Sequence, residues 1–183
     1  MAYSVGLVSL GCAKNQVDAE MMMAALQRAG YEIKDDAADA DAAIVNTCGF
    51  IDAAKKESID EILRLAGFKA QGKLKAIIVT GCLAERYREE ILKELPEVDA
   101  VAGIGADSDI AAVVGKALNG IKLQSFPEKT LLPLSGERRL STPGYSAYIK
   151  IAEGCDNRCA YCAIPFIRGH YRSRTMEDIV GEA

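Results

Sequence analysis

Short hydrophobic runs alternate with helix-like stripes along residues 1–119. Three runs rich in Val, Ile and Ala, at 5–10, 42–45 and 76–79, are apolar on both faces, as buried parallel strands are. Behind them, apolar residues recur with the spacing of one helix face, which predicts helices packed against the sheet. The stripes are Val17, Met21 and Ala25; Ile59, Ile62, Leu63 and Ala66; Tyr87, Ile91 and Leu95; and Ile110, Val113, Val114, Ala117 and Leu118. The alternation predicts an α/β fold, a parallel sheet with helices on both faces.

The pattern changes at the end of this first domain, 1–119. Residues 120–144 lose the periodicity and are rich in Pro, Ser, Lys and Glu, which predicts a linker. Residues 145–151 then predict a new strand, and residues 176–180 the beginning of a helix. Because a strand, a loop and one helix cannot bury a core alone, we expect 145–183 to be the truncated start of a second domain.

Charge and composition argue against a nucleic-acid-binding, secreted or membrane-spanning protein. The chain has 183 residues and a net charge of −4, which gives no general attraction for nucleic acid, although Arg168, His170, Arg172 and Arg174 form a local basic group. The first residues lack the order of a secretion signal, and no apolar stretch reaches the ~20 residues of a membrane helix. We therefore expect a cytoplasmic protein whose six cysteines are metal ligands or catalysts rather than disulfides.

The cysteines form two sets of three. Cys12, Cys48 and Cys82 each follow one of the hydrophobic runs, so in a parallel sheet they would meet at the edge formed by the carboxyl ends of the strands. Each also precedes a predicted helix, whose N-terminal dipole favours a thiolate. The alternative is that each is a small buried hydrophobic residue, as free cysteine often is.

The second set is the compact CxxxCxxC of Cys155, Cys159 and Cys162. Three thiolates are one ligand short of a closed iron-sulfur or structural zinc site. A 4Fe-4S cluster held this way keeps one iron open for substrate chemistry. The alternative is zinc, with His170, the one histidine, as fourth ligand.

The stretch EGCDNRCAYCAIPFIRG resembles the radical S-adenosylmethionine superfamily. The resemblance implies that residues 145–183 begin a TIM-type barrel with its first βα unit. It implies that Cys155, Cys159 and Cys162 bind a 4Fe-4S cluster whose open iron chelates S-adenosyl-L-methionine. Tyr161 would pack near the adenine, and the cofactor would supply a 5'-deoxyadenosyl radical.

GCAKN, NTCGFI and TGC, which contain the dispersed cysteines, are similar to the three N-terminal motifs of the methylthiotransferases, a family within that superfamily. The resemblance implies a second 4Fe-4S cluster on Cys12, Cys48 and Cys82, where the sulfur to be transferred would sit. The motifs look most like the branch that methylthiolates an aspartate β-carbon of the S-twelve protein of the small ribosomal subunit. The tRNA-modifying branch and a non-enzymatic zinc or cluster-binding module are the alternatives.

The family resemblance also implies partners and missing parts. It implies an electron donor such as flavodoxin, and RNA contact through a C-terminal domain that these residues lack. Because most of the radical-domain cavity would be missing, we expect no turnover from residues 1–183 alone.

Polar residues beside the cysteines suggest further roles. Asn15, Asn46 and Thr47 would donate hydrogen bonds to cluster sulfurs, or else cap helices and hold turns. The arginines of the basic group, Arg168, Arg172 and Arg174, would contact S-adenosyl-L-methionine or an acidic substrate loop, or else lie solvated at the surface.

Overall fold

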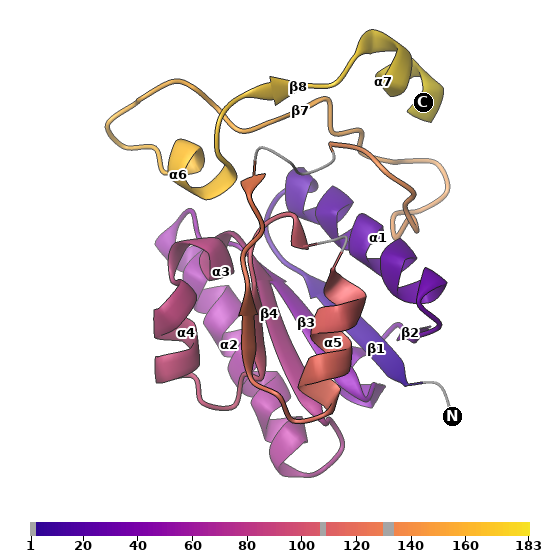
Figure 1. Cartoon of the computed structure of the whole chain (residues 1–183), viewed down its shortest axis with the longest axis vertical. Helices are drawn as coiled ribbons and strands as arrows, with labels where there is room; N and C mark the ends of the chain where they lie inside the picture. Colours follow the sequence, from indigo (N-terminus) through magenta and orange to yellow (C-terminus); the bar gives the residue numbers. More distant parts are fainter. Residues whose placement is uncertain (1–2, 107–108, 130–133) are drawn as a thin grey trace.

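The centre of the molecule is a six-stranded sheet in which every neighbouring pair of strands is parallel (Figure 1). The computed structural model describes residues 3–106, 109–129 and 134–183. In sheet order the strands are β2 (Glu32–Lys34), β1 (Ser4–Ser9), β3 (Ala42–Thr47), β4 (Ala76–Gly81), β5 (Ala100–Ala102) and β6 (Leu123–Ser125). The predicted parallel α/β sheet is confirmed.

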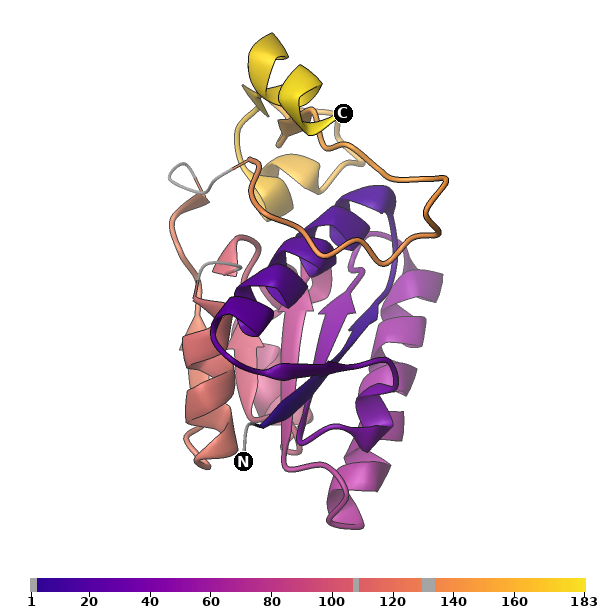
Figure 2. The ribbon, with the colours of Figure 1, turned by 90° about the vertical axis from the view of Figure 1, so that its right-hand side faces the viewer.

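Helices cover both faces of the sheet, as predicted (Figure 2). One face carries α1 (Ala13–Arg28) and α5 (Ile110–Leu118), and the other carries α2 (Asp52–Ala70), α3 (Cys82–Arg86) and α4 (Arg88–Glu94), with the short 3-10 helix η1 (Ala37–Asp39). Successive side chains of a strand point to opposite faces. In β3, Ala42 and Ile44 therefore pack in the α1 and α5 layer, while Ala43 and Val45 pack in the α2 layer. No helix among the described residues has the length and apolar composition needed to cross a bilayer.

The stripe predicted for α2 marks the helix correctly but not its buried face. Ile62 is buried as expected, yet Ile59 and Leu63 are 38% and 49% exposed. The buried face instead runs through Ser58, Ile62 and Leu65. Ser58 turns toward the sheet because its hydroxyl is hydrogen-bonded to the backbone of the loop that follows β3.

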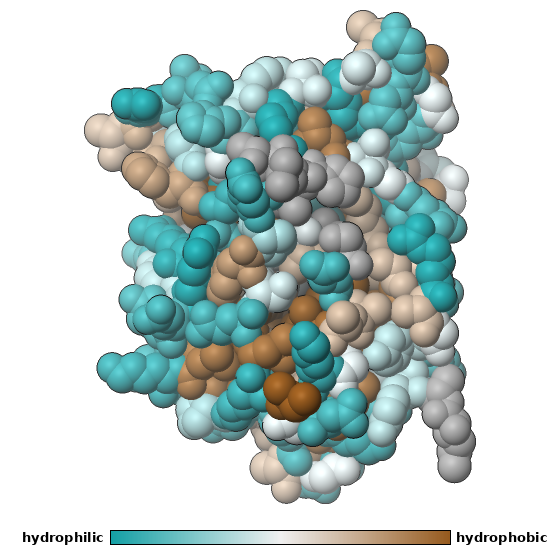
Figure 3. Space-filling view, in the orientation of Figure 1, coloured by the Kyte–Doolittle hydropathy of each residue, from teal (hydrophilic) through white to brown (hydrophobic). Residues whose placement is uncertain are grey.

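The range 120–144, predicted as a linker, contributes the last strand of the sheet. β6 pairs in parallel with β5 and forms the edge of the sheet beyond it. Its three residues, Leu-Gln-Ser, carry no hydrophobic run, so only pairing with β5 reveals the strand. Residues 130–133 of this range lie outside the described residues. In the orientation of Figure 1, the face of the molecule toward the viewer carries mainly hydrophilic side chains, with a hydrophobic area between α4 and α5 (Figure 3).

The prediction of a strand at residues 145–151 is wrong. This stretch is irregular, and the strand that follows, β7 (Ala152–Glu153), pairs antiparallel with β8 (Arg172–Ser173). The first βα unit of a barrel is therefore not formed by the described residues, since β7 has no parallel neighbour here. The helix predicted from Met176 is confirmed as α7 (Met176–Glu182), and a short α6 (Ile164–Arg168) precedes β8.

The C-terminal part of the chain lies across the carboxyl ends of the sheet strands (Figures 1 and 2). Before it arrives there, residues 137–142 form a strap along α1. The buried carboxylate of Glu20 on α1 accepts hydrogen bonds from the backbone and hydroxyl of Ser141, both at 3.1 Å, and from Arg138 at 3.2 Å. The strap thus joins the two parts of the chain along a helix of the first domain.

Candidate cofactor site at the carboxyl edge of the sheet

The loops that carry the three dispersed cysteines touch one another at one edge of the sheet. A Cβ atom built on Gly11, beside Cys12, would stand 2.9 Å from the Cβ of Cys48. A Cβ built on Gly49, beside Cys48, would stand 2.9 Å from the carbonyl carbon of Cys82. Residues far apart in sequence therefore reach the same place because their strands are parallel neighbours.

The three thiols differ in exposure and do not form a closed ligand set. Cys12 is exposed, Cys48 is half-buried and Cys82 is buried. All six cysteines lie in the described ranges, and none is in a disulfide. Among the described residues, no three His, Cys, Asp or Glu side chains are arranged to hold a metal ion.

Local backbone structure positions each of these cysteines. Cys12 is the N-cap residue of α1 in extended conformation, with its side chain free of any capping bond. Cys82 is the first residue of α3 and follows Gly81, whose φ of 90° favours glycine. Cys48 is held through its backbone, because its N–H donates to the Oγ of Ser58 at 3.1 Å. The Ser58 hydroxyl also donates to the carbonyl of Cys48 at 3.2 Å. The sequence pattern did not predict this role of Ser58.

Asn15, Asn46 and Thr47 use their polar hydrogens to tie the loops together. Asn15 Nδ2 donates to the carbonyls of Leu10 at 2.8 Å and Thr47 at 3.0 Å. Asn46 Nδ2 donates to the carbonyl of Asn15 at 2.7 Å, and the Thr47 hydroxyl donates to the carbonyl of Thr80. Two roles were predicted for these side chains: donating hydrogen bonds to cluster sulfurs, or capping helices and holding turns. Their observed hydrogen bonds to backbone carbonyls correspond to the second role.

Arg168 reaches this edge from the other part of the chain. It is the last residue of α6, and only 3% of its surface is exposed. Its Nη2 lies 3.8 Å from the Sγ of Cys82 and 2.7 Å from Oδ1 of Asn15. Its Nη1 donates to Asp18 at 3.1 Å and to Glu153 at 2.8 Å. This burial contradicts the surface solvation suggested for Arg168 from sequence, while contact with S-adenosyl-L-methionine or an acidic substrate loop stays a prediction.

Arg168 belongs to a buried ion network. Lys150 pairs with Asp18 at 2.7 Å, and Lys14 pairs with Glu153 at 3.2 Å. Burial by itself would raise the pKa of Glu153, but the nearby cations, Arg168 first, hold that pKa below its ordinary value. We refer to Lys14, Asp18, Lys150, Glu153 and Arg168 as the ion network.

The ion network acts on the nearest cysteine. Burial raises the pKa of the Cys82 thiol, and the charge of Arg168 opposes this rise. Asp18 and Glu153 raise the pKa of Arg168 against the effect of its own burial, so the guanidinium keeps its charge. A permanent positive charge therefore stands beside Cys82.

The compact CxxxCxxC occupies the loop between β7 and α6. The base of the loop is closed by a hydrogen bond from the N–H of Cys155 to the carbonyl of Gly169 at 3.1 Å, and the N–H of Cys162 donates to the carbonyl of Cys159 at 3.0 Å. Cys159 is exposed and the other two are half-buried. Tyr161 is 87% exposed, so its ring packs on little of the described chain.

His170 and the other arginines of the basic group lie in different surroundings. The Nδ1 of His170 is 2.8 Å from a carboxylate oxygen of Asp156, and these two residues line a cavity of about 250 Å³ with Cys155. Arg174 is buried and paired with Asp178 at 2.6 Å, so the surface solvation weighed for it is wrong. Arg172 is half-buried.

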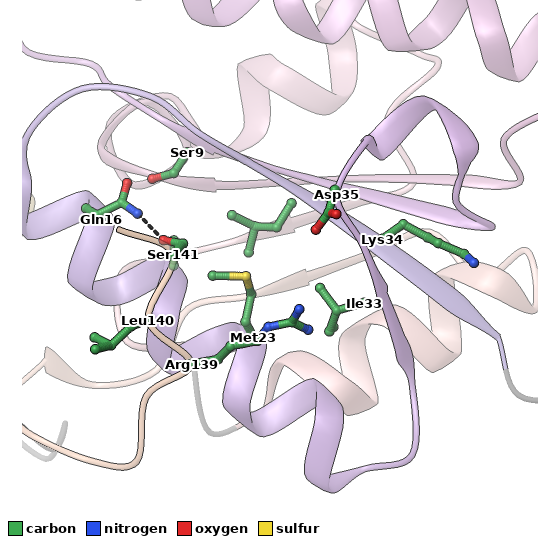
Figure 4. Close-up of a pocket in the computed structure, with 11 residues that line it drawn as sticks. Ser9, Gln16, Met23, Ile33, Lys34, Asp35, Arg139, Leu140 and Ser141 are labelled. Carbon is green, nitrogen blue, oxygen red and sulfur yellow. Dashed lines mark hydrogen bonds between the residues drawn. The ribbon is translucent and has the colours of Figure 1, made fainter. Parts of the chain in front are cut away.

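A separate pocket of about 340 Å³ lies beneath the strap (Figure 4). Ser9 and Gln16 of the first domain line it together with Arg139 and Ser141 of the strap, and the Gln16 amide donates a hydrogen bond to the Ser141 hydroxyl. None of the six cysteines lines this pocket. It is therefore distinct from both cysteine sites.

Comparison with known proteins places the first domain in a family. Residues 4–103, more than half of the chain, match the family described as "Uncharacterized protein family UPF0004". The chain belongs to this family. The UPF0004 match begins with β1 and runs through β5, and it includes all three dispersed cysteines.

Beyond the UPF0004 match, similar curated proteins carry a functional name. "Ribosomal protein uS12 methylthiotransferase RimO" of Desulforamulus reducens is 56% identical over 182 residues, covering 98% of this chain and 41% of that protein. The proteins of the same name from Natranaerobius thermophilus and Clostridioides difficile are 53% and 50% identical, covering 98% of this chain and 40% of each protein. The chain thus spans about two fifths of the length of these relatives.

The residues at the carboxyl edge fit an iron-sulfur cluster in chemical terms. The donors are thiols, the preferred ligands of such clusters. Gly11 and Gly49 let the three loops approach closely, because a Cβ atom on either would clash with the neighbouring loop. Arg168 adds positive charge, which suits bound thiolates. The thiol donors and the positive charge at this edge are therefore of the kind that suits such a group.

Proposed function

We propose that this chain is the N-terminal part of a methylthiotransferase that modifies the ribosomal protein uS12. The observation that carries the proposal is the meeting of the Cys12, Cys48 and Cys82 loops at one edge of a parallel sheet, beneath the segment that carries the CxxxCxxC. The relatives named as uS12 methylthiotransferases, at 50% to 56% identity, support the choice of reaction and substrate.

Each cysteine set has its own role in this proposal. Cys12, Cys48 and Cys82 hold one 4Fe-4S cluster, and Cys155, Cys159 and Cys162 hold a second, to which S-adenosyl-L-methionine binds. When bound, these groups supply the methylthio sulfur, the methyl group and the radical. Tyr161 covers the adenine, and its exposure leaves its ring free to do so.

The rest of the chain holds the two sites together. Asn15 and Ser58 fix the loops of the first site, and the ion network fixes the CxxxCxxC segment above it. In the proposed division, residues 1–119 together with β6 form the first domain, the rest of 120–144 connects the parts and 145–183 begin the radical domain. The two sites can then face one substrate cavity.

The substrate and partners follow from the same proposal. The group modified is the β-carbon of an aspartate of uS12, in the cytoplasm. An electron donor such as flavodoxin supplies electrons, and RNA contact falls to a further domain. Whether the substrate is the ribosomal protein or tRNA is tested by mass analysis of uS12 and of tRNA nucleosides in a deletion strain complemented with the full-length gene. Restored methylthiolation of tRNA alone would overturn the choice of substrate.

Anaerobic reconstitution tests the cofactor sites. We expect two 4Fe-4S clusters per chain, and one cluster after Cys12, Cys48 or Cys82 is changed singly to alanine. A matched triple change of Cys155, Cys159 and Cys162 to alanine should remove the other cluster only. Bound zinc without a brown chromophore, or retention of both clusters in the Cys12, Cys48 and Cys82 variants, would contradict the proposal.

A further inference from the structure

The guanidinium of Arg168 joins the two cysteine sites. Arg168 follows the CxxxCxxC by six residues, yet its side chain lies at the other site, 3.8 Å from the Sγ of Cys82. Asn15, which holds the loops after β1 and β3, accepts a hydrogen bond from the same Nη2 at 2.7 Å. Ile167, the neighbouring residue on α6, packs in a small apolar group with Cys82 and Ile104. Two adjacent residues at the end of α6, Ile167 and Arg168, thus contact the first site.

The ion network brings charged groups of both signs to this place, and Lys14 is its one member whose side chain is well exposed, at 41%. Its cations are Lys14, Lys150 and Arg168, and its anions are Asp18 and Glu153. Within the ion network, Arg168 contacts a cysteine sulfur, the Sγ of Cys82. Because a positive charge in a poorly solvated place favours negative charge next to it, the buried guanidinium beside the thiol favours an anionic group there.

We propose that Arg168 is a positioning residue that balances the negative charge of the group held by Cys12, Cys48 and Cys82. This inference rests on the proposed function, since it assumes that a cluster binds to those thiolates. It adds that the electrostatics of the first site depend on a residue of the segment that carries the second. The first site is therefore complete only when α6 is docked on α3.

The inference has a measurable consequence for the first cluster. The reduction potential of an iron-sulfur cluster depends on the charge around it and on hydrogen bonds to its sulfurs. A nearby cation stabilises the added electron, so loss of the guanidinium shifts the potential of the first cluster to a more negative value. The second cluster, bound by the loop before α6, should keep its potential.

The experiment uses the anaerobically reconstituted chain with Cys155, Cys159 and Cys162 changed to alanine, so that only the first cluster reports. Redox titration followed by electron paramagnetic resonance compares this protein with versions that also carry Arg168→Gln or Arg168→Lys. Removing Arg168 leaves Lys14 and Lys150 beside Asp18 and Glu153, and because the Lys14 side chain is 41% exposed, Arg168→Lys serves as the variant that keeps the buried charge. Arg174→Gln is the matched control, because Arg174 is also buried but is paired with Asp178 and Glu182.

The inference predicts a negative shift in Arg168→Gln, a smaller shift or none in Arg168→Lys, and none in Arg174→Gln. Loss of the cluster in Arg168→Gln that Arg168→Lys restores supports it equally. An unchanged potential in Arg168→Gln, or an equal shift in the Arg174→Gln control, overturns the inference while the proposed function stands. A cluster lost in both Arg168 variants overturns the argument from charge. Failure of the parent protein to bind any cluster through Cys12, Cys48 and Cys82 overturns the proposed function itself.

Discussion

Gly11 lies so close to Cys48 that a Cβ atom on Gly11 would stand 2.9 Å from the Cβ of Cys48 and 3.3 Å from its Sγ. Ordinary contact between such carbons begins near 3.4 Å, so any side chain at position 11 displaces the cysteine. Gly11 also has a φ of 99°, which other residues rarely adopt. The spacing between the first two cysteine loops therefore depends on a missing side chain.

Changing Gly11 to alanine should both destabilise the fold and disturb the first site. The positive φ alone costs about 1 kcal/mol, and the clash with Cys48 adds to it. Gly30→Ala is a matched control, because Gly30 has a φ of 89° but no atom within 4 Å of a built Cβ. Urea unfolding should show a larger loss for Gly11→Ala, with lower iron content after reconstitution. Equal losses in the two variants would refute the steric argument.

Removing the hydroxyl of Ser58 should weaken the loop that carries Cys48. Ser58→Ala leaves the N–H of Cys48 without its 3.1 Å partner, which costs about 1–2 kcal/mol for a poorly solvated donor. Ser173→Ala is the control, since this residue is exposed and its change should stay within about 0.5 kcal/mol. Chemical denaturation measures both, and equal stability of the two variants would show that the bond contributes nothing.

The strap should detach from α1 when the carboxylate of Glu20 is removed. Glu20→Ala leaves Arg138 without one of its buried partners and Ser141 without its acceptor, and breaking a buried ion pair costs about 3–5 kcal/mol. Trypsin should then cleave after Arg138 or Arg139 much faster than in the parent protein. Glu137→Ala is the control, because its pair with Arg28 is about two-thirds exposed and should contribute little. Unchanged cleavage in Glu20→Ala would mean that other contacts hold the strap.

Acid stability should depend on Asp41, which joins the beginnings of β1 and β3. The carboxylate accepts a hydrogen bond from Lys75 and from the backbone and hydroxyl of Ser4, and these interactions lower the pKa of Asp41 from 3.8 to about 2. A lowered pKa contributes stability above pH 3.8, and that contribution is lost as the pH falls through about 2. The contribution near neutral pH is on the order of 1 to 2 kcal/mol, because the pair is partly exposed.

Asp41→Asn tests this contribution. The variant should be less stable than the parent protein at neutral pH, and the difference should shrink below about pH 4. Thermal unfolding followed across the pH range measures the difference, with the exposed Asp60→Asn as control. A difference that stays constant down to pH 2 would contradict the assignment.

Local pattern predicted much of the first domain. The runs before Cys12, Cys48 and Cys82 became β1, β3 and β4, since the central part of a strand buried on both faces is a continuous hydrophobic run. β6 and the two-residue β7 escaped prediction because each depends on a partner strand and carries no pattern of its own. The prediction that Ile59 faces the core was wrong for a related reason. Periodicity indicates a helix, but contacts with the sheet decide which side of that helix is buried.

The sequence by itself determined the alternation of strands and helices, and with it the edge of the sheet at which three cysteines meet. Only the tertiary structure decided which charges stand beside them. Arg168 and Asp18 are 150 residues apart and lie on opposite parts of the chain. Burial of an apolar face repeats along a helix or strand and is visible locally. The pairing of one guanidinium with one carboxylate or thiol follows no period, so it exists only once the chain has folded.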